Sequence, residues 1–330
     1  MHDTEGELAS IKRRIATATG SWARATSLAE IRASFDALFA GDEPCDFDTF
    51  SIGTMRAAWI EPPVGANGRT ILFCHGGGFQ VGSIRSHLGL MRRLADAARS
   101  RVLAIEYRLA PEHKYPAATE DAFAAYRWLL EQALPASRIA LAGDSAGAAL
   151  AIQVALRARD EQLALPACAA LISPWLDLTM RGASYDSRAA VDIFSKPEQL
   201  AAMARTYLGR NQIATASIAS PVEADLSRLP PILIHAGDDD ITLDDSFLLA
   251  GRARRHGVDV RVQVWKGMFH HFQMFSDLPE SRESLIELGK FIMERVPGTI
   301  EVQEGFRSSC AASHTPRDTD RLAGDKGRGR

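Results

Sequence analysis

The chain lacks the features that would place it in a membrane or on a nucleic acid. None of its apolar runs approaches the roughly 20 residues that a membrane span needs. Its 38 Lys and Arg nearly balance its 41 Asp and Glu, and the formal net charge of −3 gives no electrostatic reason for binding nucleic acid or an anionic membrane. Residues 1–20 are polar and hold no apolar core of a signal peptide, so we expect a cytoplasmic protein.

Cysteine is also scarce, and its spacing excludes two further classes. The four cysteines lie far apart, at Cys45, Cys74, Cys168 and Cys310. No pair has metal-ligand spacing, and a disulfide framework is not expected in a cytosolic chain of this size. Cys74 and Cys168 fall in predicted strands, where cysteine behaves as a small buried apolar residue. We predict no metal site.

What the chain has is an alternation of short apolar strands and helices. Its 330 residues, 46% hydrophobic, suit one large α/β domain or two small ones. The alternation predicts a mainly parallel sheet covered by helices on both faces, with its site at the carboxyl ends of the strands. The predicted strands are 70–74, 102–107, 139–142, 167–172, 232–235 and 258–264, after a leading strand or antiparallel pair in 50–60. The predicted helices are 28–39, 85–99, 117–134, 148–157, 196–208, 243–256 and 279–296.

Three segments depart from this alternation. Residues 1–45 are predicted to be a helical segment that covers either core or a pocket, because Ser27 and Glu30 form a capping box ahead of an apolar helical stripe. No strand is predicted in 176–220. We therefore predict that this segment is an insertion into the main domain of 46–296 and forms part of the same cap. Residues 297–330 have few large apolar residues and are expected to be a disordered tail.

The strand at 139–142 leads into Gly143-Asp-Ser-Ala-Gly147 and a helix of small residues. Strand, tight turn and helix form the context in which a Gly-x-Ser-x-Gly motif exposes a nucleophilic serine, here Ser145. The flanking glycines let the helix pass close to the strand, where a β-carbon would clash. The simpler alternative is a turn with a serine at a helix N-terminus, so the rest of the chain must supply a base, an acid and an oxyanion hole.

The loop after the strand at 70–74 can supply the oxyanion hole. It reads His75-Gly-Gly-Gly-Phe79, and consecutive glycines let main-chain N–H groups turn toward a substrate oxygen. The other donor would be the N–H of the residue after the nucleophile, Ala146. A phosphate loop would need Gly-Lys-Ser or Gly-Lys-Thr, which the chain does not have.

The base must be a histidine late in the chain. Of nine histidines, His270 and His271 lie between the last predicted strand and the last helix. We expect His75 to orient the glycine loop and His87 to lie in a loop or at the surface.

The acid is expected after the strand at 232–235, where Asp238, Asp239 and Asp240 are all candidates by position. Asp244 and Asp245 fit the first turn of the next helix, where acids favour the macrodipole. Asp144 precedes the nucleophile directly and is predicted to be a structural residue or part of the site wall.

Five motifs in this order resemble the hormone-sensitive-lipase-like family of esterases, which includes the bacterial family IV carboxylesterases and monoterpene lactone hydrolases. The resemblance covers about residues 45–296. The motifs are His75-Gly-Gly-Gly-Phe79, Tyr107-Arg-Leu-Ala-Pro-Glu112, Gly143-Asp-Ser-Ala-Gly147, Ser173-Pro-Trp-Leu-Asp177 and Gly267-Met-Phe-His270.

The resemblance implies an α/β-hydrolase fold with a helical cap and assigns the site residues. The nucleophile is Ser145, the base His270, and the acid the fourth residue of the Ala-Gly-x-Asp stretch, Asp239. The oxyanion donors are Gly77, Gly78 and Ala146. Family members often have Gly after the histidine, where this chain has His271, and Asp238 and Asp240 flank the assigned acid.

These assignments predict a serine carboxylesterase that acts on short- to medium-chain esters without a cofactor. A lactone hydrolase would use the same triad. A non-catalytic receptor of the same fold is the alternative from another class, but such proteins typically lose the histidine, and His270 is present. The predicted partner is a small-molecule ester or lactone, with neither nucleic acid nor membrane, and a homo-oligomer is possible.

Overall fold

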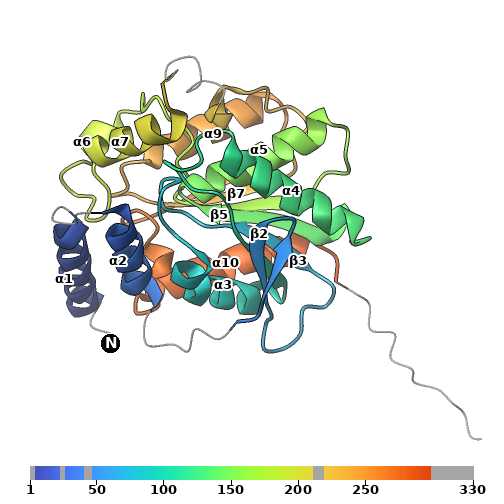
Figure 1. The fold of residues 1–330 in the computed structure, drawn as a ribbon, viewed down its shortest axis with the longest axis horizontal. Coiled ribbons are helices and arrows are strands. Elements are labelled where there is room, and N and C mark those ends of the chain that lie inside the picture. Colours follow the sequence, from blue (N-terminus) through green and yellow to red (C-terminus); the bar gives the residue numbers. More distant parts are fainter. Residues whose placement is uncertain (1–3, 23–26, 41–46, 211–218, 299–330) are drawn as a thin grey trace, which may run out of the picture. The chain divides into compact units, whose positions relative to one another are not determined.

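The structure is built around one eight-stranded sheet (Figure 1). It is a computed structural model that describes residues 4–22, 27–40, 47–210 and 219–298. The strand order is β1-β2-β4-β3-β5-β6-β7-β8; β1 and β2 run antiparallel to their neighbours and the other strands are parallel. The strands are β1 (Thr49–Ile52), β2 (Met55–Ile60), β3 (Thr70–Cys74), β4 (Arg101–Glu106), β5 (Ile139–Asp144), β6 (Cys168–Ile172), β7 (Ile232–Gly237) and β8 (Val260–Trp265).

Helices cover both faces of this sheet, and each face has its own hydrophobic core. One core joins the sheet to α4 (Ala117–Glu131), α5 (Ala146–Asp160) and α9 (Leu243–Arg255). The other joins it to α3 (Ile84–Ala98) and α10 (Pro279–Arg295). Because both faces are covered, β3, β5, β6 and β7 are buried along their whole length. Their continuous apolar runs are the signature of such strands.

The predicted α/β class and the order of its elements are confirmed. The 50–60 segment forms the antiparallel pair β1 and β2. Each later predicted strand is present, with ends that differ by a few residues, as at β7, which continues to Gly237 instead of ending at His235. The helix after Ser145 begins at Ala146 rather than at Ala148.

The remaining helices lie at one end of the sheet in Figure 1: α1 (Thr4–Trp22), α2 (Leu28–Ala40), α6 (Ser184–Ser187) and α7 (Pro197–Leu208). The Ser27 hydroxyl accepts the Glu30 N–H at 3.3 Å, as the capping pattern predicts. Ile11, Ile15 and Phe35 are buried in the core shared with α3 and α10, so the N-terminal helices cover core as well as a pocket. The 176–220 segment contains no strand among its described residues. The predicted domain boundaries stay predictions.

Two sequence predictions fall partly outside the described residues. Cys45, Cys310 and the tail from residue 299 onward lie there. Cys74 and Cys168 are free thiols buried in β3 and β6, and burial raises the pKa of each to about 12. Among the described helices, none is long and apolar enough to cross a membrane.

Candidate active site

Ser145 occupies the sharp turn between β5 and α5. Its backbone has φ 51° and ψ −119°, a conformation that costs free energy for a residue with a β-carbon and that recurs at functional sites. A β-carbon on Gly147 would lie 1.9 Å from the Cys74 carbonyl oxygen, so only glycine lets α5 start this close to β3. The turn predicted from the Gly-x-Ser-x-Gly motif is therefore present, with Ser145 held on a strained backbone.

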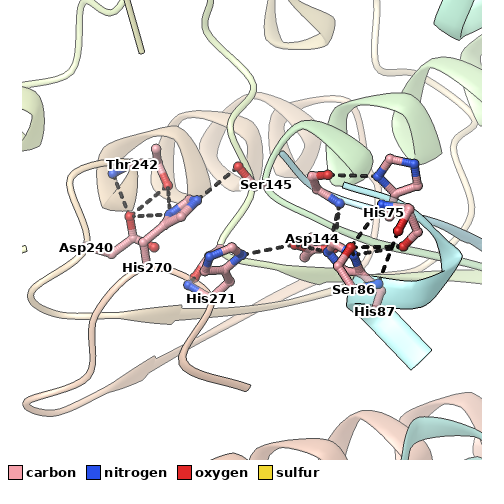
Figure 2. Close-up of polar contacts among 12 residues, drawn as sticks. His75, Ser86, His87, Asp144, Ser145, Asp240, Thr242, His270 and His271 are labelled. Carbon is pink, nitrogen blue, oxygen red and sulfur yellow. Dashed lines mark hydrogen bonds and ion pairs between the residues drawn. The ribbon is translucent and has the colours of Figure 1, made fainter. Parts of the chain in front are cut away.

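His270 contacts the serine from the loop that follows β8. Its Nε2 lies 2.9 Å from the Ser145 Oγ, and its Nδ1 lies 2.9 Å from the Asp240 Oδ1 (Figure 2). The carboxylate can only accept, so Nδ1 carries the proton and Nε2 is free to accept the serine proton. Serine, imidazole and carboxylate thus form one hydrogen-bonded chain across three loops.

The assignment of the acid to Asp239 is wrong, because the carboxylate beside His270 belongs to Asp240. β7 remains paired with β8 through Gly237, and the Asp239 N–H still bonds the Met268 carbonyl oxygen at 3.0 Å. The chain turns at Asp238 and Asp239, and Asp240 follows this turn ahead of α9. The Asp240 Oδ1 then accepts the Thr242 N–H at 2.8 Å and the Thr242 hydroxyl at 2.9 Å, which fixes its orientation. Asp238 and Asp239 are only partly buried.

The electrostatics of the site match this pairing. Burial alone would lower the pKa of His270, but the charge and hydrogen bond of Asp240, together with the charges of Asp192 and Asp144, outweigh burial and raise the pKa above 6.5. Burial would likewise raise the pKa of Asp240, and His270 reverses that shift. By contrast, the pKa of Asp239 is raised by partial burial and by the neighbouring Asp238 charge. The pair stabilises the charged states that proton transfer from serine requires.

The glycine loop lies against the serine. Gly77 and Gly78 line the same cavity as Ser145 and His270, and Ala146 directly follows the serine at the start of α5. His75 Nδ1 lies 2.8 Å from the Gly76 carbonyl oxygen, and the Tyr107 hydroxyl donates to the His75 carbonyl oxygen at 2.6 Å. The expectation that His75 orients the loop is confirmed, and the Tyr107 motif holds it in place.

A second histidine–carboxylate network surrounds Asp144. Its Oδ1 accepts the Gly76 N–H at 2.8 Å, and its Oδ2 lies 3.3 Å from His87 Nε2 and 3.1 Å from His271 Nδ1 (Figure 2). Burial would raise the pKa of Asp144, but the two histidines hold it well below its usual range. Asp144 is therefore structural, as predicted. The expectation for His87 is wrong, because this side chain is fully buried.

The cavity above Ser145 has a volume of about 260 Å³ and mostly apolar walls. One wall comes from the N-terminal helices through Trp22, Ile31 and Phe35. The insertion contributes further lining residues, among them Met203 and Phe194, whose ring packs against those of Trp22 and Phe35. Both segments that the sequence placed in a cap thus border the site. Among the described residues, no cluster of His, Cys, Asp and Glu could hold a metal ion.

Fold and site together are those of an α/β hydrolase. A family model described as alpha/beta hydrolase fold matches residues 71–274. The chain belongs to this family and, within it, to the hormone-sensitive-lipase-like (bacterial family IV) esterases, which are carboxylic ester hydrolases. The resemblance seen in the sequence motifs is confirmed.

Individual relatives support this membership. An acetyl-hydrolase of Streptomyces hygroscopicus is 42% identical over 246 residues, which cover 74% of this chain and 82% of that protein. An esterase of Acinetobacter venetianus is 36% identical over 67% of this chain and 73% of its own length. The crystal structure of an esterase from the bacterial hormone-sensitive lipase family aligns with a TM-score of 0.84 and 35% identity, over 90% of this chain and 100% of that one.

Proposed function

We propose that the protein hydrolyses short- to medium-chain esters through an acyl-enzyme on Ser145. The observation that carries the proposal is the unbroken hydrogen-bonded chain from the Ser145 Oγ through His270 to Asp240. Such a chain makes an otherwise weak hydroxyl nucleophilic, because the imidazole takes the proton as the oxygen attacks.

In the proposed reaction, the Ser145 Oγ attacks the ester carbonyl carbon while His270 Nε2 takes its proton. The carbonyl oxygen becomes an oxyanion that the N–H groups of Gly77, Gly78 and Ala146 stabilise. His270 then gives the proton to the departing alcohol as the carbon–oxygen bond breaks. Water, deprotonated by the same imidazole, cleaves the acyl-serine ester and restores the hydroxyl. Asp240 keeps the imidazole in the required tautomer.

The cavity supports small, uncharged acyl groups. Its volume of about 260 Å³ lies below the roughly 300–1,000 Å³ of sites that hold drug-sized ligands. The described residues that line it include no Asp, Glu, Lys or Arg, so a charged acyl group would lose hydration without gaining a partner. Trp22, Phe35 and Phe194 provide apolar contact area for a short chain.

The test is Ser145→Ala, assayed with p-nitrophenyl butyrate. We expect hydrolysis to fall by about 10⁶-fold in kcat, as for removal of a triad nucleophile, with the fold intact. A fluorophosphonate should label the wild type on Ser145 and leave the variant unlabelled. Retention of wild-type kcat in the variant would disprove the nucleophile.

A panel of esters and lactones with graded acyl length tests the substrate class. We expect kcat/KM to be highest for the short uncharged acyl groups and to decline for long chains. A lactone is a cyclic ester open to the same attack, and a preference for lactones over every linear ester would replace the proposed substrate class while keeping the triad.

A further inference from the structure

His271 is the residue at which this chain departs from the glycine that often follows the base in its family. Its side chain is 1% exposed, and its backbone has φ 40° and ψ 43°, the left-handed region that glycine and asparagine adopt most readily. A histidine is less favourable than glycine in this backbone conformation. The contacts of its ring indicate which role could offset that cost.

The ring contacts connect His271 to the glycine loop through one carboxylate. His271 Nδ1 lies 3.1 Å from the Asp144 Oδ2, and the Asp144 Oδ1 accepts the Gly76 N–H at 2.8 Å. Asp144 can only accept hydrogen bonds, so His271 Nδ1 carries the proton. Burial lowers the pKa of His271 to about 4, so the ring remains a neutral donor at neutral pH. Figure 2 shows this path beside the triad, from His271 through Asp144 toward the glycine loop.

The two ends of this path carry the proposed catalytic groups. His271 directly follows His270, and Gly76 directly precedes the proposed oxyanion donors Gly77 and Gly78. Asp144, in the middle, directly precedes Ser145. The His271 N–H also donates to the Ser173 hydroxyl at 2.9 Å, which anchors its backbone to the loop after β6. The base, the nucleophile and the first oxyanion glycine are therefore each the sequence neighbour of a residue in one hydrogen-bonded network.

We propose that His271 is a positioning residue, whose hydrogen bond to Asp144 fixes the distance between the His270 loop and the oxyanion glycine loop. The inference rests on the proposed function, since it assigns His271 to the same reaction. The His271 ring lines the same cavity as Ser145, but the role proposed for it is to position other groups rather than to react. His271 would keep the oxyanion N–H donors and the His270 base at a fixed separation while charge develops on the substrate oxygen. This geometry is required in the transition state rather than for substrate binding.

The test compares His271→Gly with His271→Asn. Both residues tolerate the left-handed backbone, but only asparagine offers an N–H near the position of Nδ1. We expect His271→Gly to lower kcat for p-nitrophenyl butyrate about 10- to 100-fold with little change in KM, the scale reported for small misplacements of catalytic groups. His271→Asn should recover most of that loss. Inhibition by phenylboronic acid, which forms a tetrahedral adduct on serine, should weaken in His271→Gly in parallel with kcat/KM.

Phe39→Leu is the packing control. The Phe39 ring packs edge-on against the His271 ring at 5.6 Å and has no hydrogen-bonding group, so this variant loosens the packing but keeps the donor. We expect kcat close to wild type. A His271→Asn variant as slow as His271→Gly, or a His271→Gly variant with wild-type kcat, would overturn the inference. Ser145→Ala is assayed alongside: if it is inactive, such a result rejects only the role of His271, whereas an active Ser145→Ala rejects the proposed function itself.

Discussion

His270 and His271 are neighbours in the chain, and each forms a hydrogen bond with a buried carboxylate, yet their chemistry differs. The pKa of His270 is raised above 6.5, whereas that of His271 is lowered to about 4. Both shifts begin from burial, which disfavours the charged ring. His270 also faces the charges of Asp240 and Asp192, which outweigh burial. His271 shares Asp144 with His87 and lies beside His270, so burial prevails.

The comparison teaches that a histidine–carboxylate pair does not by itself make a base. What matters is whether a second histidine shares the carboxylate and what the other ring nitrogen faces. Asp144 is shared by two histidines and a backbone N–H, and the Nε2 of His271 is buried without a hydrogen-bond partner among the described residues. The Nε2 of His270 faces the Ser145 hydroxyl. Of the two rings, only that of His270 has a proton donor, the Ser145 hydroxyl, facing its unprotonated nitrogen. Its raised pKa also lets it carry the positive charge that follows proton transfer.

The largest expected effect breaks the His270 pair. Asp240→Asn should lower kcat by about 10⁴-fold, because the amide NH2 can donate to Nδ1 and favour the wrong tautomer of His270, and a neutral amide does not stabilise the imidazolium. Asp239→Asn is the matched control, with the same substitution one residue earlier on a partly exposed side chain, and should leave kcat nearly unchanged. Steady-state kinetics with p-nitrophenyl butyrate measures both. A larger loss of kcat in Asp239→Asn than in Asp240→Asn would show that Asp239, the residue that the family pattern favours, is the triad acid.

The second prediction concerns pH. His270 must be neutral to accept the serine proton, and its pKa is raised above 6.5. As the pH falls through that raised value the imidazole becomes charged, so kcat/KM should fall about tenfold per pH unit below it. A pH–rate profile of the wild type should therefore show its acidic limb above pH 6.5. A limb near pH 4 would indicate that the essential ring has the environment of His271.

The smallest effect comes from Asp192, a buried residue of the insertion. Its carboxylate accepts the N–H groups of Phe194, Ser195 and Ile241, and its charge contributes to the raised pKa of His270. Burial, followed by the Asp240 charge, raises the pKa of Asp192 itself to about 6. Asp192→Asn removes this charge, so the acidic limb of kcat/KM should move to lower pH by less than about one unit. An unchanged limb, or one at higher pH, would exclude Asp192 from the electrostatics of the base.

Local sequence determined much of this protein. The Gly-x-Ser-x-Gly motif between an apolar strand and a small-residue helix predicts a turn that only glycine permits, and Gly147 meets the Cys74 carbonyl as that prediction requires. The apolar runs of β3, β5, β6 and β7 predict strands buried on both faces. These features follow from sterics and burial within a few residues, which is why a single sequence contains them.

Only the tertiary structure decided which of several similar side chains meet. Three consecutive aspartates follow β7, and the choice of Asp240 depends on where β7 stops pairing with β8, a contact between strands 28 residues apart at Gly237 and Trp265. The sequence also predicts His87 in a loop or at the surface, whereas its partner Asp144 lies 57 positions away in the chain. The backbone pattern of each segment is local, whereas the pairing of charges depends on how distant loops converge at the carboxyl end of the sheet.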